Sequence, residues 1–168
     1  MSGYGTSVFS GCSELNIPDL VIPNTVTSIG DYAFNGCSNI TSITVPNSVT
    51  SIGNGAFRGT NPTKVTLPFI GHSKTATGNA RIFGYVFGLT EQGIPSYNNF
   101  DQSLVPTGAI YANFRRYESN YYYYSCCYIP KTIKEVIITD DTSVPYQAFY
   151  SIVIECKESM RKRKGIAD

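Results

Sequence analysis

The chain has 168 residues and a formal net charge of +1 at pH 7, so we expect one domain with its own core and no strong attraction to nucleic acid. Hydrophobic residues make up 42% of the chain and charged residues only 15%, a composition that excludes disorder caused by charge repulsion. The 13 Tyr, 15 Gly and absence of Trp are typical of strands and turns. No apolar run is long enough to cross a membrane.

Residues 1–18 have the features of the last part of a degenerate repeat. Phe9 and Cys12 have the same spacing as Phe34 and Cys37, and at these cysteine positions we expect small buried thiols rather than a disulfide framework. The N-terminus has neither the basic head nor the apolar core of a signal peptide. We expect a cytoplasmic protein if the chain is complete, or part of a longer cell-surface or secreted protein; the start within a repeat favours the second.

Two consecutive segments, residues 22–34 and 45–57, have almost the same sequence. The proline, the Ser-Ile-Gly triplet and the Ala-Phe pair return after about 23 residues. A period of this length indicates stacked repeats. One repeat cannot bury its own apolar side chains, so each must pack against its neighbours. Gly30 and Gly53 are expected to allow a backbone bend that a side chain would hinder. The other recurring positions are Pro23 and Pro46, Val26 and Val49, Ile29 and Ile52, and Phe34 and Phe57.

Three short strands are expected at residues 20–22, 43–45 and 65–67. Their side chains alternate in period two, which predicts that the first and third residues of each strand point into the core and the middle one points outward. A proline follows each strand and turns the chain, because it cannot donate a hydrogen bond to a sheet. Phe34 and Phe57 are expected to fill the other side of each repeat.

The phrase Ile-Pro-x-x-Val-Thr-Ser-Ile-Gly-x-x-Ala-Phe-x-x-Cys-x-x-Ile, found within residues 20–68, resembles the BspA-like leucine-rich repeat. The resemblance implies a leucine-rich-repeat solenoid, mainly β, in which a curved right-handed stack carries a parallel sheet on its concave face. It also implies an exported or surface-attached protein that acts in adhesion and protein binding. It implies no enzymatic activity.

The regular period stops at residues 69–128, a stretch rich in aromatic residues and glycine. A flexible linker would not contain so many large rings, so we expect an insertion of irregular strands and turns that packs on the stack and interrupts the solenoid. Within it, residues 83–88 resemble a motif found between repeats in bacterial members of the family. A run of four tyrosines follows at residues 121–124.

The repeat pattern returns over residues 129–156. A strand is expected there with Val136 and Ile138 pointing inward, and residues 142–149 restate the Thr-Ser-Ile-Gly-x-x-Ala-Phe phrase. The chain is thus predicted to be a single leucine-rich-repeat domain, residues 1–168, divided into N-terminal repeats (1–68), an insertion (69–128), a resumed repeat (129–156) and a basic tail (157–168).

No combination of residues indicates catalysis, cofactor binding or metal binding. The one histidine, His72, could form a Cys–His pair with Cys126 or Cys127, but no recognised motif surrounds these cysteines, so we expect no enzyme. Asp140 and Asp141 are expected to close a turn, because no further carboxylates stand at metal-binding spacing.

The outward residues of the parallel strands are expected to bind a protein partner, in the host or the extracellular matrix, because a stacked sheet presents a broad surface with few cavities. Two alternatives remain open: a carbohydrate-binding module that uses the tyrosines of the insertion, and a structural spacer without a ligand. The expected protein-binding residues are Asp19, Val21, Ser42, Thr44, Lys64, Thr66, Glu135 and Ile137. The alternative aromatic patch comprises Tyr111, Tyr117, Tyr121, Tyr122, Tyr123 and Tyr124.

Overall fold

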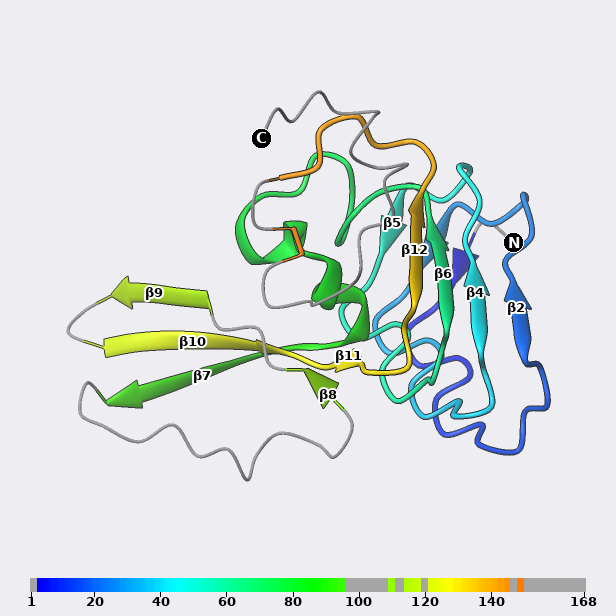
Figure 1. Ribbon diagram of the computed structural model, residues 1–168, viewed down its shortest axis with the longest axis horizontal. Coiled ribbons are helices and arrows are strands. Elements are labelled where there is room, and N and C mark those ends of the chain that lie inside the picture. The colour runs from blue at the N-terminus through cyan, green and yellow to red at the C-terminus, as the bar shows by residue number, and fades with distance from the viewer. Residues whose placement is uncertain (1–2, 96–108, 111–113, 119–120, 146–147, 150–168) are drawn as a thin grey trace.

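Two parallel sheets run through a stack of successive layers in the computed structural model, which describes residues 3–95, 109–110, 114–118, 121–145 and 148–149 (Figure 1). In the first sheet the strand order is β12-β6-β4-β2, and in the second it is β1-β3-β5. All neighbouring strands in both sheets are parallel. The strands are β1 (Gly3–Tyr4), β2 (Asp19–Val21), β3 (Ser28–Ile29), β4 (Ser42–Thr44), β5 (Ser51–Ile52), β6 (Lys64–Leu67) and β12 (Glu135–Ile138).

In each of the first three layers, a strand of the second sheet leads through a turn to a strand of the first sheet, and the fourth layer contributes β12 to the first sheet. We call residues 3–22 the first layer, 23–45 the second, 46–67 the third, and 68–88 with 129–138 the fourth. In the described part of the chain the helices are short 3-10 turns, η1 (Gly78–Arg81) and η2 (Phe83–Phe87). The mostly-strand fold with parallel sheets is the one that the repeat pattern predicts.

The core between the two sheets has the residues that the alternation predicts. Leu20 and Ile22, Ile43 and Val45, and Val65 and Leu67 are buried, whereas the middle residue of each strand is more exposed. In β12, Val136 is buried and Ile138 packs against the core from a partly buried position. The inward assignment of all four strands is confirmed.

A column of aromatic rings fills the other side of the layers. Phe9 stacks on Phe34 with ring centroids 5.2 Å apart, and Phe34 stacks on Phe57 at 5.7 Å. Tyr4 packs edge-on against both Phe9 and Phe34. Phe34 and Phe57 are buried, so the predicted filling by aromatic side chains is confirmed, and residues 3–18 do belong to a first repeat.

Gly30 and Gly53 lie where the backbones of neighbouring layers approach each other closely. A Cβ atom at Gly53 would lie 2.5 Å from the carbonyl carbon of Gly30, and one at Gly30 would lie 2.6 Å from that of Gly5. Neither glycine has a positive φ. The requirement for glycine therefore comes from contact between layers as well as from any bend within one layer.

Residues 69–88 continue the stack without repeating its sequence. The amide of Ile52 donates to the carbonyl of His72 at 2.8 Å, and the amide of Phe57 donates to that of Val86 at 2.8 Å. The same kind of bond joins the earlier layers, as from Phe34 to Ala56. The chain thus leaves the stack after Gly88 rather than at Phe69. Backbone hydrogen bonds between layers do not depend on the repeated side chains, so the stack continues where the repeated phrase has ended.

Beyond Gly88 the chain forms a separate antiparallel sheet before it returns. The strand order is β7-β10-β9, and Figure 1 shows this sheet extending away from the stack. The returning chain enters β12 and completes the fourth layer beside β6. The strands outside the stack are β7 (Leu89–Pro95), β9 (Phe114–Glu118) and β10 (Tyr121–Cys127), with β8 (Ala109–Ile110) paired to β11 (Ile129–Pro130).

The end of the restated phrase, Ala148 and Phe149, lies against the fourth layer, whereas residues 146–147 lie outside the described residues. The amide of Phe83 donates to the carbonyl of Ala148 at 2.9 Å, and the rings of Phe83 and Phe149 are 5.4 Å apart. Ala148 is buried. Ala148 and the partly buried Phe149 therefore pack against the fourth layer, while the predicted tail at 157–168 lies outside the described residues.

Candidate protein-binding face

Parallel pairing places the eight predicted binding residues in two straight rows on the outward face of the first sheet. The register joins equivalent positions of β2, β4, β6 and β12 without a shift. Adjacent strands in a sheet lie about 4.8 Å apart, so each row is a regular ladder across four layers. The first row is Asp19, Ser42, Lys64 and Glu135; the second row is Val21, Thr44, Thr66 and Ile137.

Polar contacts join neighbouring side chains within the first row. The hydroxyl of Ser42 donates to Oδ1 of Asp19 at 2.9 Å, and Nζ of Lys64 lies 3.4 Å from Oε2 of Glu135. The Lys64 and Glu135 side chains are 50% and 45% exposed, so this ion pair adds little to stability. The row therefore offers hydrogen-bonding groups to a partner without a strong net charge.

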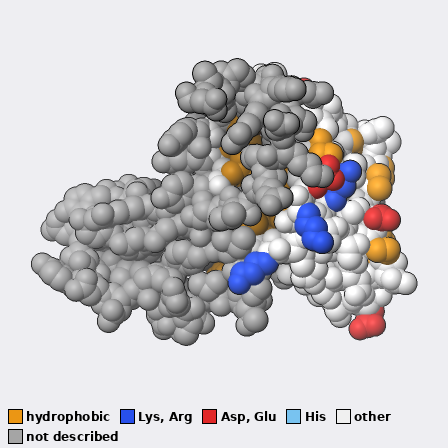
Figure 2. Space-filling view, in the orientation of Figure 1, with side chains coloured by type: hydrophobic (Ala, Val, Ile, Leu, Met, Phe, Trp, Pro, Cys, Tyr) orange, Lys and Arg blue, Asp and Glu red, His pale blue; other side chains and the backbone are white. Residues whose placement is uncertain are grey.

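The second row consists entirely of β-branched residues. Val21 is 64% exposed at one end, and Thr44, Thr66 and Ile137 are half-buried. β-Branched side chains have few rotamers, so the surface they form is already ordered before a partner binds. In Figure 2 the described part of the surface shows hydrophobic, basic and acidic side chains interspersed with uncharged atoms, and an acidic group lies against a basic one.

The tyrosines of the alternative patch lie in the sheet that leaves the stack. Tyr121–Tyr124 are in β10 and Tyr117 is in β9, and the antiparallel register sets Tyr122 opposite Tyr117 on one side and Ile94 on the other. Tyr111 lies outside the described residues. The fold thus brings Tyr117 and Tyr122 together, at the level of strand register.

Of the residues in the catalytic alternative, His72 and Cys127 both pack against neighbouring residues, while the side chain of Cys126 lies outside the described residues. Nδ1 of His72 lies 2.9 Å from the carbonyl oxygen of Ile52, and its ring packs edge-on against Tyr85 at 5.8 Å. Cys127 is buried, and a Cβ atom at Gly84 would lie 2.3 Å from its Cβ. His72 and Cys127 are therefore both part of the packing of the fourth layer.

At the repeated cysteine position, Cys37 is buried as expected, whereas Cys12 is only partly buried. Cys37 is fully buried, and its Sγ donates to the carbonyl of Phe9 at 3.2 Å. Burial, with a smaller contribution from the nearby Cys12, raises the pKa of the Cys37 thiol. Cys12 and Cys37 both carry free thiols, and a raised pKa keeps Cys37 in the unreactive protonated form at neutral pH.

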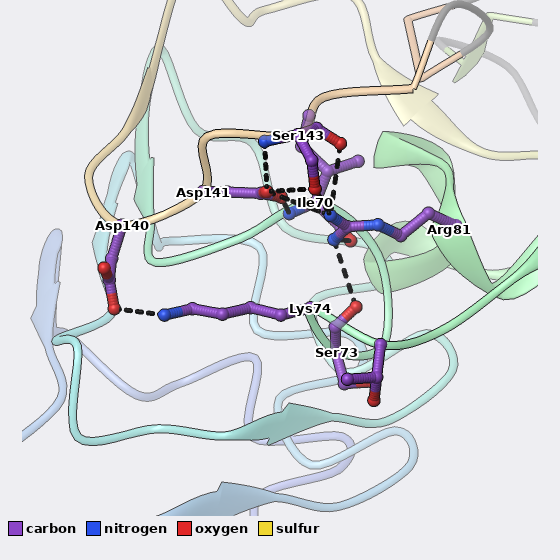
Figure 3. A network of polar contacts seen from close by, with 8 residues as sticks. Ile70, Ser73, Lys74, Arg81, Asp140, Asp141 and Ser143 are labelled. Atoms are coloured by element: carbon purple, nitrogen blue, oxygen red, sulfur yellow. Dashed lines mark hydrogen bonds and ion pairs between the residues drawn. The ribbon is translucent and has the colours of Figure 1, made fainter.

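A buried ion pair between Arg81 and Asp141 is the most extensive polar feature that the sequence reasoning missed (Figure 3). Nη2 of Arg81 lies 2.8 Å from Oδ2 of Asp141, and the two side chains are 7% and 2% exposed. Nη1 of Arg81 also donates to the carbonyls of Ile70 at 2.9 Å and Ser73 at 3.1 Å. The guanidinium thus holds residues 70–81 against the turn that follows β12.

Asp141 also has the turn-closing role that the sequence predicts. Its Oδ1 accepts the amide hydrogen of Ser143 at 3.1 Å, and its Oδ2 accepts that of Ile70 at 3.3 Å. Burial alone would raise the pKa of Asp141, but these two hydrogen bonds and the charge of Arg81 outweigh it, so the pKa lies below its usual value. The neighbouring Asp140 pairs with Lys74 in a more exposed position.

Arg81 and Asp141 were recognisable in the sequence as charged residues. They are 60 positions apart, so no local sequence pattern shows that they form a pair. The donors of Arg81 are directed at protein oxygens, and the carboxylate of Asp141 accepts from protein groups. In the described residues, no group of three or more His, Cys, Asp or Glu side chains could hold a metal ion. This network therefore stabilises the fourth layer, and the outward face of the first sheet is the candidate binding site.

A comparison with protein families finds a family with this repeat architecture. The model of the BspA type leucine rich repeat region (6 copies) matches residues 4–104. The chain belongs to the BspA-type leucine-rich repeat family. The match extends through residues 69–88, which the structure places in the fourth layer of this BspA-type stack.

BspA-type repeats generally serve as protein-interaction or surface modules. No match was found among the curated proteins or among the solved structures that were compared with the chain. Over the described ranges, no helix has the length and apolar composition needed to cross a membrane. The family thus supports protein binding in general, and the choice of surface rests on the geometry of the two rows.

Proposed function

We propose that this chain is a non-catalytic module that binds a host or extracellular protein, as part of an adhesin-like protein at the cell surface or in the secreted fraction. The observation that carries the proposal is the alignment of eight outward side chains, from four layers, in two unshifted rows. A broad, ordered surface of this kind suits an extended macromolecular partner better than a small molecule.

We further infer that the stack is a curved right-handed solenoid and that the two rows lie on its concave face, as in other leucine-rich repeats. Concave sheets of this type surround part of a partner, so several layers contact it together. The rows combine paired charges with β-branched side chains, which favours modest affinity for each module. A longer parent protein with several such modules would gain binding strength through multivalency.

The double variant Thr44→Arg with Thr66→Arg tests this site. Both threonines are in the middle of the second row, so two long cations should abolish capture of the partner from a panel of extracellular matrix and host surface proteins. A matched control is Thr25→Arg with Thr50→Arg, since both residues are exposed and lie outside the first sheet. If both double variants melt like the wild type and both still capture the partner as the wild type does, the outward face is not the binding site.

A second candidate function is carbohydrate binding by the sheet β7-β10-β9. The register that sets Tyr122 opposite Tyr117 favours it, because tyrosine rings can stack on the apolar faces of sugars. A glycan array separates the two functions. Glycan binding that is lost in the double variant Tyr117→Ala with Tyr122→Ala, but kept in Thr44→Arg with Thr66→Arg, would assign the ligand to that sheet.

A further inference from the structure

An Asn-x-Thr triplet lies at a turn of the second layer. Asn39-Ile40-Thr41 is the one Asn-x-Ser or Asn-x-Thr sequence in the chain whose middle residue is not proline. In exported proteins such a triplet is the acceptor for N-linked glycosylation, which attaches an oligosaccharide to the asparagine amide. Short motifs of this kind also occur by chance, so the surroundings of the triplet in the fold decide whether it can carry an oligosaccharide.

The asparagine and the threonine of this triplet are at the surface, and the residue between them is in the core. Asn39 and Thr41 are exposed, whereas Ile40 is fully buried. The triplet ends immediately before Ser42, the first residue of β4. Ile40 therefore anchors the turn that leads into the first sheet, and the fold keeps Asn39 on the outside, where a bulky group can be attached.

The hydrogen bond that Asn39 makes to the first layer is compatible with an attached sugar. Nδ2 of Asn39 donates to the carbonyl of Ser13 at 2.8 Å. The side-chain amide of asparagine has two N–H donors, and glycosylation replaces only one of the two hydrogens. The remaining hydrogen is sufficient for the bond to Ser13, so the layers can keep this contact after modification.

The third layer contains the same arrangement with a proline in the middle. Asn61 and Thr63 are exposed, and Pro62 between them is buried. Nδ2 of Asn61 donates to a carbonyl of the preceding layer at 3.0 Å, as Asn39 does. Proline has a fixed φ and no amide hydrogen, and a triplet with proline in the middle is not an acceptor. The chain thus holds an open triplet and a blocked one in equivalent surroundings.

We propose that Asn39 is the acceptor for one N-linked oligosaccharide when the chain is exported, an inference that rests on the export included in the proposed function. In the transfer, Nδ2 of Asn39 forms a bond to the anomeric carbon of the first sugar of a lipid-linked oligosaccharide. The bond from that carbon to a phosphate oxygen of the lipid diphosphate breaks. The lipid diphosphate leaves with the electron pair, and the amide nitrogen gives one proton to a base.

Intact-mass spectrometry tests the acceptor on the full chain, secreted behind a cleavable signal peptide from cells that have an N-glycosylation pathway. The wild type should carry one oligosaccharide, and its removal by peptide-N-glycosidase should leave an aspartate at position 39. Asn39→Gln should be secreted without the oligosaccharide. Since this variant also alters the bond to Ser13, two further variants keep Asn39 and change only the hydroxyl position: Thr41→Ala should lose the oligosaccharide, and Thr41→Ser should keep it.

Pro62→Ile is the matched variant that opens the blocked triplet. It gives Asn61 the same neighbours as Asn39, so the secreted chain should carry a second oligosaccharide. A wild type that is secreted without an oligosaccharide would overturn the proposal. An oligosaccharide that is kept in both Asn39→Gln and Thr41→Ala would also overturn it, because the acceptor would then be another residue. A glycosylated wild type that captures no host or extracellular protein would contradict the proposed function and still support Asn39 as the acceptor.

Discussion

At Asp141, burial and hydrogen bonding act on the same carboxylate in opposite directions. The side chain is 2% exposed, yet its pKa is lowered because it accepts two amide hydrogens and faces Arg81. A carboxylate whose pKa is lowered by hydrogen bonds and an ion pair stabilises the fold only while it is ionised. The tie between residues 70–81 and the turn after β12 therefore depends on pH.

Asp141→Asn should lower the free energy of unfolding by about 3–5 kcal/mol at neutral pH, because it leaves the buried charge of Arg81 without its counter-ion. In the wild type, the contribution of Asp141 is fully present above the unfolded-state pKa of about 4 and is lost as the pH falls through the lower folded-state pKa. Urea unfolding at a series of pH values should show this acid-side loss in the wild type and a smaller one in the variant.

Asp140→Asn is the control for that measurement. Asp140 is 44% exposed in its pair with Lys74, so its loss should change the free energy of unfolding by less than about 1 kcal/mol. If the two variants were destabilised equally, Arg81 and Asp141 would not form a buried pair in solution.

At the scale of strands and turns, the sequence predicted the segments that carry the repeated phrase and missed the role of residues 69–88, which lack it. The strands expected at 20–22, 43–45 and 65–67 lie at Asp19–Val21, Ser42–Thr44 and Lys64–Leu67, so their ends were predicted to within one residue. Their inward residues follow from period-two alternation, since one face of each strand is buried. Residues 69–88 have no such phrase, although they supply the turn of the fourth layer through backbone hydrogen bonds to Ile52 and Phe57. Backbone pairing carries no side-chain signature, so local patterns could not reveal it.

Gly53→Ala tests the close contact between layers. The added Cβ would lie 2.5 Å from the carbonyl carbon of Gly30, so the layers must separate, and we expect a loss of about 1–3 kcal/mol in the free energy of unfolding. Gly5→Ala is the matched control, because its Cβ would meet only Cγ2 of Val8 at an ordinary 3.5 Å. Equal thermal melting of both variants would show that the layers are not packed as closely as the structure has them.

For the whole molecule, the candidate face depends on strands that are far apart in the chain. The positions of its residues could be predicted, because equivalent residues of stacked repeats must fall in register once the period is known. The partner could not be predicted, since paired charges and β-branched side chains specify no single ligand chemistry. Nor could the pairing of Arg81 with Asp141, because a local pattern does not join residues from separate segments.

Hydrogen–deuterium exchange tests most directly whether the face is continuous across the fourth layer. The amides of Ile22, Val45 and Thr139 donate across successive strand pairs to Thr44, Thr66 and Leu67, at 2.9, 2.9 and 3.0 Å. We predict slow exchange of comparable protection at all three. Exchange of Thr139 at the rate of an unstructured peptide, with Ile22 and Val45 still protected, would mean that β12 does not complete the sheet and would contradict a binding face that includes Glu135 and Ile137.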